Sequence, residues 1–161
     1  VDALRRMILE TERLDGEVRF VLAGDLEEAR SSGDWGSTEF FGELPLSRLA
    51  ELLAECHLGV CLRKEREAMR KALPAKVFDY LGAGLPVLSS PAGELSAFLL
   101  ERGVGLTFER TDPKAIASAI VAFKKDPERQ ARMATNVRAL LPSLDRRVQA
   151  VRFAEHLESL V

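Results

Sequence analysis

The stretch LPAKVFDYLGAGLPVLSS, residues 73–90, decides the fold class predicted for this 161-residue chain. Its segment Ala75 to Leu81 has the pattern of a helix, and Gly82-Ala83-Gly84 supplies the residues that end one. The next segment, Pro86 to Ser89, is typical of a short buried strand. A helix that leads through a tight turn into a buried strand predicts one unit of a parallel sheet covered by helices.

The rest of the chain repeats this alternation of strands and helices. Strands are predicted at residues 18–23, 38–41, 58–62, 86–89 and 104–108, and helices at residues 4–14, 45–56, 75–81, 94–102, 112–125, 126–141 and 143–160. Asp112-Pro113 and Asp126-Pro127 each begin a helix with a capping aspartate followed by proline. The pattern predicts a Rossmann-like, three-layer α/β/α fold with a parallel sheet and a helical C-terminal tail.

We expect one domain over residues 1–161, with its core in residues 1–125 and C-terminal helices in residues 126–161. The first predicted element is a helix, whereas a doubly wound sheet normally begins with a central strand. We therefore expect the sheet to lack its first strand. Two arrangements would compensate: direct pairing of the neighbouring strands, or a strand supplied by a separate fragment.

Composition and charge narrow the class of protein. Hydrophobic residues make up 47% of the chain and charged residues 30%, with a net charge of −2, as in ordinary globular proteins. This balance argues against a nucleic-acid partner, which requires many clustered cations. The most basic cluster, Arg63 to Lys71, is interrupted by Glu65 and Glu67 and suits a single anion.

No apolar run reaches the roughly 18 residues of a membrane-spanning helix, and the first residues show no signal-peptide pattern. We therefore expect a cytoplasmic protein. It would meet the inner face of a membrane only through a segment outside this chain.

The residues that most often carry chemistry have structural interpretations here. Cys56 and Cys61 are expected to be buried free thiols, with neither a disulfide nor a metal. His57 ends a predicted helix, and His156 is expected at the surface. Trp35, inside a polar run, is expected to pin a loop rather than to stack on a base. No nucleophile–base pair or carboxylate pair emerges, so no catalytic residue is assigned.

Candidate binding residues gather where the predicted strands end, because ligands of open α/β sheets bind beyond the carboxyl ends of the strands. These positions are Gly24-Asp25, Gly42-Glu43-Leu44, Arg63 and the loop from Ser89 to Glu94. The loop leads into a helix whose free N–H groups favour a phosphate, and Gly93 would let the backbone approach it. An ordinary β-to-α turn is the alternative.

Lys76 and Asp79 lie three residues apart and therefore share one face of the predicted helix. The lysine ammonium suits a diphosphate, and the aspartate carboxylate suits the two hydroxyls of a ribose. A solvated ion pair between the two residues is the alternative.

The stretch at residues 73–90 resembles a motif of retaining GT-B glycosyltransferases, in the glycosyltransferase family 4-like group. That motif reads Pro-x-Lys-hydrophobic-x-Glu-Tyr-hydrophobic-x-x-Gly-x-Pro-Val and precedes a Gly-Glu loop. It is matched here from Pro74 to Val87, and Gly93-Glu94 matches the loop. The similarity extends over about residues 1–133. By this resemblance, the chain is half of a GT-B fold, the C-terminal domain that binds the donor.

The resemblance implies roles for particular residues. Asp79 falls where the motif glutamate binds the donor ribose, residues 42–44 fall where backbone contacts the base, and Gly93-Glu94 falls where the loop meets the donor. Asp79 is one methylene shorter than glutamate, and Lys71 stands where the family has an upstream glutamate. The family's first strand, with its Gly-Arg…Lys phosphate-binding segment, is not matched.

Together these features predict the donor-binding domain of a retaining glycosyltransferase of the hexosyltransferase type. It would use a UDP- or GDP-type nucleotide sugar as substrate, in polysaccharide or glycoconjugate biosynthesis, with no cofactor and no metal. Its second partner would be the missing N-terminal acceptor domain, reached by the helix at residues 143–160, and the chain alone would not transfer sugar. A stand-alone nucleotide-binding domain and a degenerate, non-catalytic scaffold are the alternatives.

Overall fold

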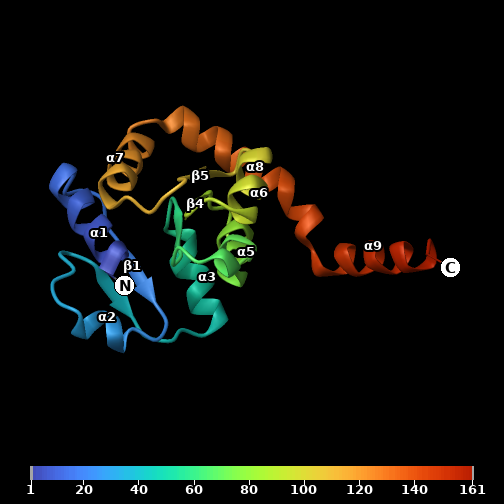
Figure 1. Ribbon diagram of the computed structural model, residues 1–161, viewed down its shortest axis with the longest axis horizontal. Coiled ribbons are helices and arrows are strands. Elements are labelled where there is room, and N and C mark those ends of the chain that lie inside the picture. The colour runs from blue at the N-terminus through green and yellow to red at the C-terminus, as the bar shows by residue number, and fades with distance from the viewer. Residues whose placement is uncertain (1, 161) are drawn as a thin grey trace.

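The computed structural model describes residues 2–160, in which helices and short strands alternate (Figure 1). The strands are β1 (Val21–Ala23), β2 (Glu39–Phe41), β3 (Gly59–Leu62), β4 (Val87–Ser90) and β5 (Gly105–Thr107). The helices are α1 (Asp2–Leu14), α2 (Glu27–Ser31), α3 (Leu46–Ala54), α4 (Glu67–Arg70), α5 (Ala75–Gly82), α6 (Glu94–Glu101), α7 (Pro113–Lys124), α8 (Pro127–Leu144) and α9 (Arg146–Glu158).

The strands pair in parallel, as predicted, but they form two sheets instead of one. β1 pairs with β2, and the second sheet has the order β3–β4–β5. Direct pairing of the neighbouring strands, one of the two arrangements considered above, is therefore wrong, because β1 and β3 are not hydrogen-bonded neighbours.

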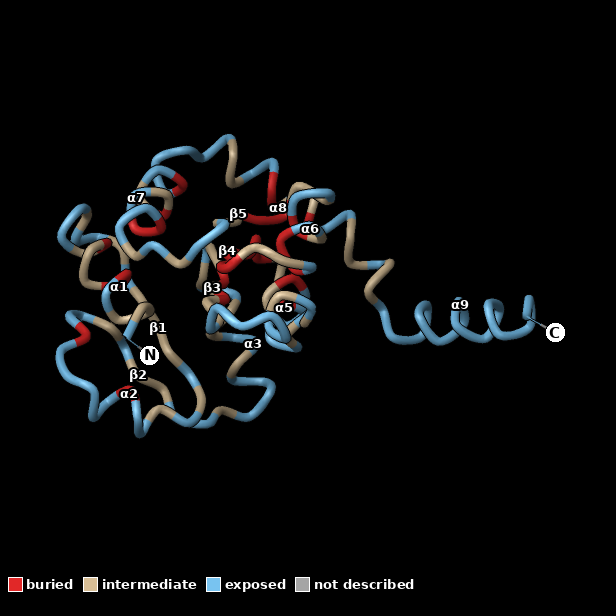
Figure 2. The backbone as a smooth tube through the Cα atoms, in the orientation of Figure 1, coloured by how far each residue is buried: buried red, intermediate tan, exposed pale blue. Residues whose placement is uncertain are grey.

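Helices cover both faces, which confirms the Rossmann-like α/β/α fold. Neighbouring residues of β4 point to opposite faces, as in any strand. Leu88 belongs to a buried cluster shared with α1 and α7, whereas Val87 belongs to a second cluster shared with α5, α6 and α8. Figure 2 shows the buried residues concentrated around β4 and β5 and in the helices beside them.

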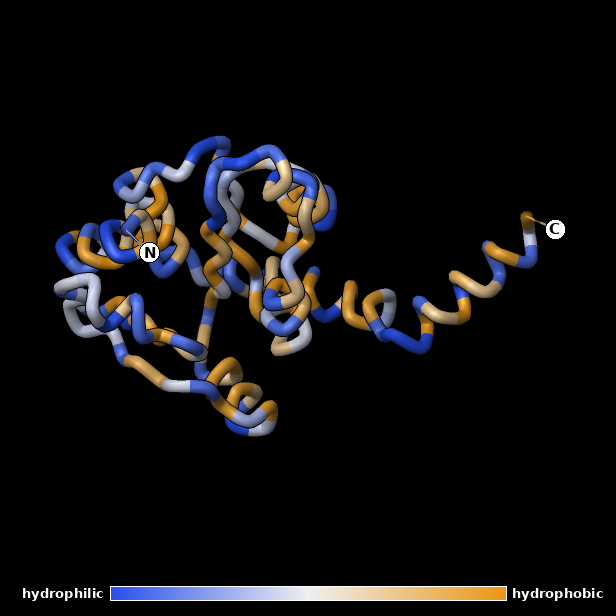
Figure 3. Tube along the Cα trace, turned by 60° about the horizontal axis from the view of Figure 1, so that its bottom comes forward, coloured by the Kyte–Doolittle hydropathy of each residue, from blue (hydrophilic) through white to orange (hydrophobic). Residues whose placement is uncertain are grey.

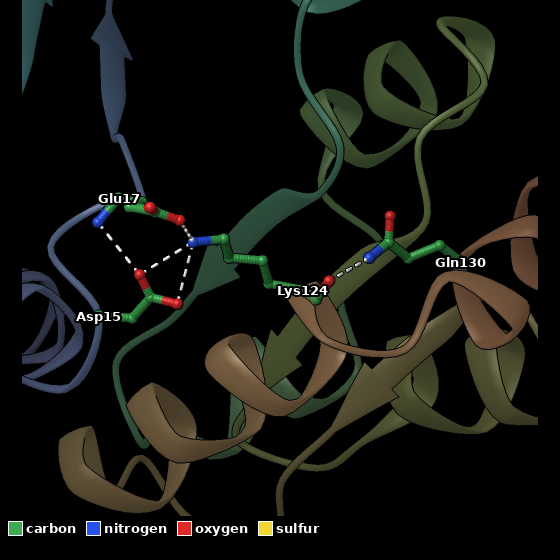
Figure 4. Close-up of polar contacts among 4 residues, drawn as sticks. All are labelled: Asp15, Glu17, Lys124 and Gln130. Atoms are coloured by element: carbon green, nitrogen blue, oxygen red, sulfur yellow. Dashed lines mark hydrogen bonds and ion pairs between the residues drawn. The ribbon is translucent and has the colours of Figure 1, made fainter.

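The two sheets share one strand direction, which can be deduced from the way α1 packs against α7. Lys124, at the end of α7, contacts Asp15 at 2.9 Å and Glu17 at 2.8 Å just beyond the end of α1 (Figure 4). α1 and α7 thus pack side by side with their C-terminal ends together. Since β1 returns from the end of α1 and β5 leads into the start of α7, both strands run toward the same edge of the fold.

The same ion-pair cluster shifts the pKa values of Asp15 and Lys124. The hydrogen bonds from Lys124 and from the Glu17 amide lower the pKa of Asp15, and the hydrogen bonds to Asp15 and Glu17 raise the pKa of Lys124. Asp15 therefore contributes stability above its unfolded pKa of 3.8, and this contribution disappears as the pH falls through its lower folded value.

Three local differences from the prediction have physical reasons. The short helices α2 and α4 were not predicted, because neither is long enough to show a periodic pattern. The predicted break at Pro142 is wrong, since α8 continues to Leu144 with Pro142 inside it. The boundary between α8 and α9 lies at Asp145. Its carboxylate caps α9 by accepting the N–H of Arg147 at 2.7 Å.

Trp35 pins the loop between α2 and β2, as predicted. Its side chain is buried, its indole N–H donates to the Ala29 carbonyl at 2.7 Å, and its ring meets Phe40 edge to face at 5.8 Å. The indole thereby fixes α2 relative to β2.

The last helix, α9, extends away from the body of the molecule (Figures 1 and 3). Its residues are exposed, including Val151, Phe153 and Leu157. No helix within residues 2–160 combines the length and the apolar character needed to cross a bilayer.

Neighbouring leucines on α6 provide a test of the core. Leu99 is fully buried, whereas Leu100 is 61% exposed. We expect Leu99→Ala to lower the free energy of unfolding by about 2–5 kcal/mol, and the matched Leu100→Ala to change it by less than about 0.5 kcal/mol. Urea denaturation followed by circular dichroism measures both, and equal effects would contradict this packing.

Candidate functional site

The candidate site lies at the edge where all the parallel strands end. Leaving this edge, β1 leads to Gly24-Asp25, β2 to Gly42-Glu43, β3 to Arg63, and β4 to the loop at residues 91–93. The first turn of α5, with Lys76, lies at the same edge because a crossover helix runs opposite to its strands. The structure therefore brings the predicted residues to one side of the fold.

Beyond β1 and β2 this edge is hollowed into an open cleft of about 440 Å³. Its lining residues come from both strand ends and from α2: Gly24, Asp25, Leu26, Glu27, Arg30, Gly42 and Glu43. Leu44 is half-buried and lies just outside this lining. Arg30, which the sequence analysis missed, donates to the Phe40 carbonyl at 3.3 Å and stacks on the Phe40 ring. No sequence signal marked it, because it lies on the unpredicted helix α2.

Arg63 acts as a brace between two loops. Its guanidinium donates to the carbonyls of Met69, Ala72 (2.9 Å) and Pro91 (3.1 Å). These bonds tie the segment after β3 to the loop after β4. Its Nε is buried and has no hydrogen-bond partner among the described residues. Arg63 was predicted to bind a ligand, but most of its hydrogen bonds go to the protein's own backbone carbonyls.

Gly93 is required by packing within the chain. A Cβ atom at this position would lie 2.2 Å from the Arg70 carbonyl oxygen. The Arg70 side chain also bonds the Ala92 carbonyl at 3.3 Å. The glycine was predicted to allow the close approach of a ligand, but the group that approaches it is the backbone at residue 70.

Lys76 and Asp79 are both exposed on α5. Within residues 2–160 no ion pair joins them, so the solvated pair considered above does not form. The charges of Lys76 and Arg63 both act on the buried Cys61 thiol, where they oppose the burial that raises its pKa. Both cations therefore lie near β3.

The helices of the fold differ in how their first turns are satisfied. α7, α8 and α9 each begin with an aspartate whose carboxylate accepts backbone N–H groups. By contrast, α5 begins after Pro74 and α6 after Gly93, and neither residue caps its helix with a side chain. The free N–H groups of α5 and α6, together with the helix dipoles, create positive potential at the carboxyl edge. Glu94, in the first turn of α6, offsets part of it.

The cysteines and histidines have structural positions. Cys61 is buried as predicted, whereas Cys56 is only half-buried, and both are free thiols. Cys56 and His57 line a second cleft of about 340 Å³, beside Pro86 and the start of α8. This cleft lies where β3 and β4 begin, opposite the candidate site. The described residues contain no cluster of His, Cys, Asp or Glu placed to hold a metal ion.

Tyr80 lies on the buried side of α5, next to the polar face that carries Lys76 and Asp79. Its ring packs over Gly59, where a Cβ atom would lie 2.4 Å from it, and its hydroxyl reaches the Val60 carbonyl at 3.5 Å. Burial, with smaller effects from Cys61 and Asp79, raises the Tyr80 pKa to about 12. The ring thereby fixes α5 on β3 and sets where Lys76 and Asp79 project.

Residues 4–152 match a protein-family model described as glycosyl transferase-like. The match covers most of the chain, which therefore belongs to the glycosyl transferase-like family. This confirms the glycosyltransferase resemblance drawn from residues 73–90, while the narrower family 4-like assignment stays a prediction. A search of curated proteins found no match.

The position of Tyr80 can be tested directly, because it is the only tyrosine. A folded pKa near 12 means that stability present below the unfolded pKa of about 10 is lost as the pH rises between these values. Just after a pH jump to about 11, we expect little phenolate absorbance from the folded chain and a large signal from the urea-unfolded chain. Full ionisation of the folded chain would show that the hydroxyl is exposed.

Proposed function

We propose that this chain binds the nucleotide-sugar donor of a retaining glycosyltransferase at the carboxyl edge of its strands. The observation that carries the proposal is the meeting, at this edge, of two helix N-termini without side-chain caps and the exposed Lys76. Such an arrangement suits a diphosphate, and membership of the glycosyl transferase-like family makes a nucleotide-diphosphate sugar the natural ligand.

In this proposal the diphosphate lies before the first turns of α5 and α6. Backbone N–H groups donate to its oxygens, and Lys76 adds a point charge on the same side. These donors also stabilise the negative charge that grows on the leaving nucleotide during transfer. Arg63 contributes mainly by holding together the two loops that frame this space.

In this proposal the ribose lies near Asp79, and the base lies in the cleft beyond β2. Asp79 lies one helical turn beyond Lys76, and its carboxylate oxygens suit the two ribose hydroxyls. The backbone of Gly42, Glu43 and Leu44 borders the cleft beyond β2, which would accept the base. Gly93-Glu94 would contact the sugar end of the donor.

Transfer of the sugar also requires an acceptor substrate. We assign the binding of this acceptor to an N-terminal domain of the whole enzyme. The exposed apolar residues of α9 provide a surface for contact with that domain. Within this half we assign binding roles only, with no catalytic residue and neither a cofactor nor a metal.

Isothermal titration of the chain with UDP, GDP and uridine tests the proposal. We expect one of the two diphosphates to bind with a Kd below about 1 mM, and uridine to bind more weakly because it lacks phosphates. Asp79→Ala should weaken binding about 10- to 100-fold, because it removes charge-assisted hydrogen bonds to the ribose.

Matched controls separate the site from general charge effects. Lys76→Ala should weaken diphosphate binding, whereas Lys125→Ala, an exposed lysine at the end of α7, should not. The absence of binding at millimolar diphosphate would contradict the proposal and favour a non-catalytic scaffold. Unchanged affinity in Asp79→Ala would contradict the ribose assignment.

A further inference from the structure

The cleft beyond β1 and β2 is rich in hydrogen-bond acceptors. Three of its seven lining residues, Asp25, Glu27 and Glu43, are acidic, and a carboxylate accepts hydrogen bonds without donating any. Among the described residues, no ion pair involves any of these three carboxylates. The Gly24 N–H is not free either, because it donates to the Gly42 carbonyl at 3.1 Å. A ligand in this cleft must therefore present N–H donors to the carboxylates.

Arg30 brings donors to the same cleft. Its guanidinium has several N–H groups, and within residues 2–160 it makes one hydrogen bond, to the Phe40 carbonyl at 3.3 Å. The guanidinium also lies 5.5 Å from the centre of the Phe40 ring, and Trp35 meets that ring edge to face. Arg30 is therefore held beside β2 with N–H groups left for a ligand.

Of the three carboxylates, that of Glu43 is the best placed to receive a ligand. Asp25 already accepts the Glu27 N–H at 3.4 Å, and Glu27 lies in the first turn of α2, where the helix dipole favours its charge. Glu43 lies just beyond β2, whose Phe40 carbonyl holds Arg30. No ion pair joins Glu43 to Arg30 in the part of the chain that the structure describes, although both line the cleft.

Nucleobases differ in the edges that they present to such a pair of charges. Guanine places its N1–H and its N2 amino group side by side, and its O6 and N7 acceptors lie side by side on another edge. Uracil presents one N–H between two carbonyl oxygens, whereas adenine and cytosine place their amino group next to an acceptor nitrogen. A carboxylate therefore accepts two adjacent hydrogen bonds from guanine, but it faces a repelling acceptor on each of the other bases.

We infer, resting on the function proposed above, that this cleft selects guanine and that the donor is a GDP-sugar. The Glu43 carboxylate accepts the N1–H and the N2 amino group, and Arg30 donates to O6 and N7. Arginine on O6 and N7 of guanine is the most common specific contact between a side chain and a base in DNA. The planar base thereby joins two opposite charges that form no ion pair with each other. The cleft volume of about 440 Å³ is within the range of ligand pockets.

Isothermal titration of the chain with GDP, inosine diphosphate and UDP tests the inference. Inosine diphosphate keeps the N1–H, O6 and N7 of guanine and lacks only the N2 amino group. We expect GDP to bind at least about tenfold more tightly than inosine diphosphate, because one hydrogen bond to a carboxylate is lost. We expect a difference at least as large between GDP and UDP, because uracil turns carbonyl oxygens toward the carboxylate.

Two variants separate the roles of the charged residues. Glu43→Gln should weaken GDP binding about 10- to 100-fold and bring the affinities for GDP and inosine diphosphate within about threefold, without weakening UDP binding. Arg30→Lys should weaken GDP and inosine diphosphate by the same factor, because both nucleotides keep O6 and N7. The matched control is Glu39→Gln, at an exposed glutamate of β2 outside the cleft lining, which should change none of the three affinities.

The outcomes distinguish this inference from the function on which it rests. UDP or inosine diphosphate binding as tightly as GDP would overturn the guanine assignment and leave the diphosphate site standing. Equal weakening of GDP and UDP in Glu43→Gln would also overturn it, because the substitution would then act on the site as a whole. The absence of binding by all three diphosphates would contradict the proposed function, and the choice of guanine would fail with it.

Discussion

Lys124, Asp15 and Glu17 join the C-terminal ends of α1 and α7, and this contact shows that the two helices run the same way. With both helices running the same way, β1 and β5 run toward the same edge, and parallel pairing extends that direction to β2, β3 and β4. Every loop that leaves a strand therefore emerges on one side of the molecule. That geometry gathers residues far apart in sequence and gives a binding site its place.

The charged groups at this edge are of two kinds: some bind other parts of the protein, and others are exposed and available to a ligand. Arg63 and Arg70 use their guanidinium groups on backbone carbonyls of neighbouring loops. Their role is to fix the loops after β3 and β4, and Gly93 allows those loops to touch. Among residues 2–160, no ion pair involves Lys76 or Asp79, and no side chain caps the first turns of α5 and α6. These free groups match the parts of a nucleoside diphosphate, and they are the basis of the proposed function.

Much of the fold was predictable from local sequence, and much of the site was not. Each predicted strand is present: four are shorter than predicted, and β4 has the predicted length but lies one residue later. The aspartate caps at Asp112 and Asp126 are confirmed, because strand and cap signals are local. The partners of Arg63, by contrast, come from segments up to 28 residues away in the chain, so no spacing rule predicts them. The division of the strands into two sheets depends on which strands pair in the folded chain. The hydrophobic periodicity of the sequence therefore does not predict it.

The central claim is that the carboxyl edge, and no other surface, binds a nucleoside diphosphate. Chemical-shift mapping of the ¹⁵N-labelled chain during titration with UDP and GDP tests it most directly, because it locates the ligand residue by residue. We expect the largest shifts at the amides of Ala75, Lys76, Glu94 and Leu95, in the first turns of α5 and α6. Shifts confined to the opposite cleft, around His57, Pro86 and Gln130, would contradict it.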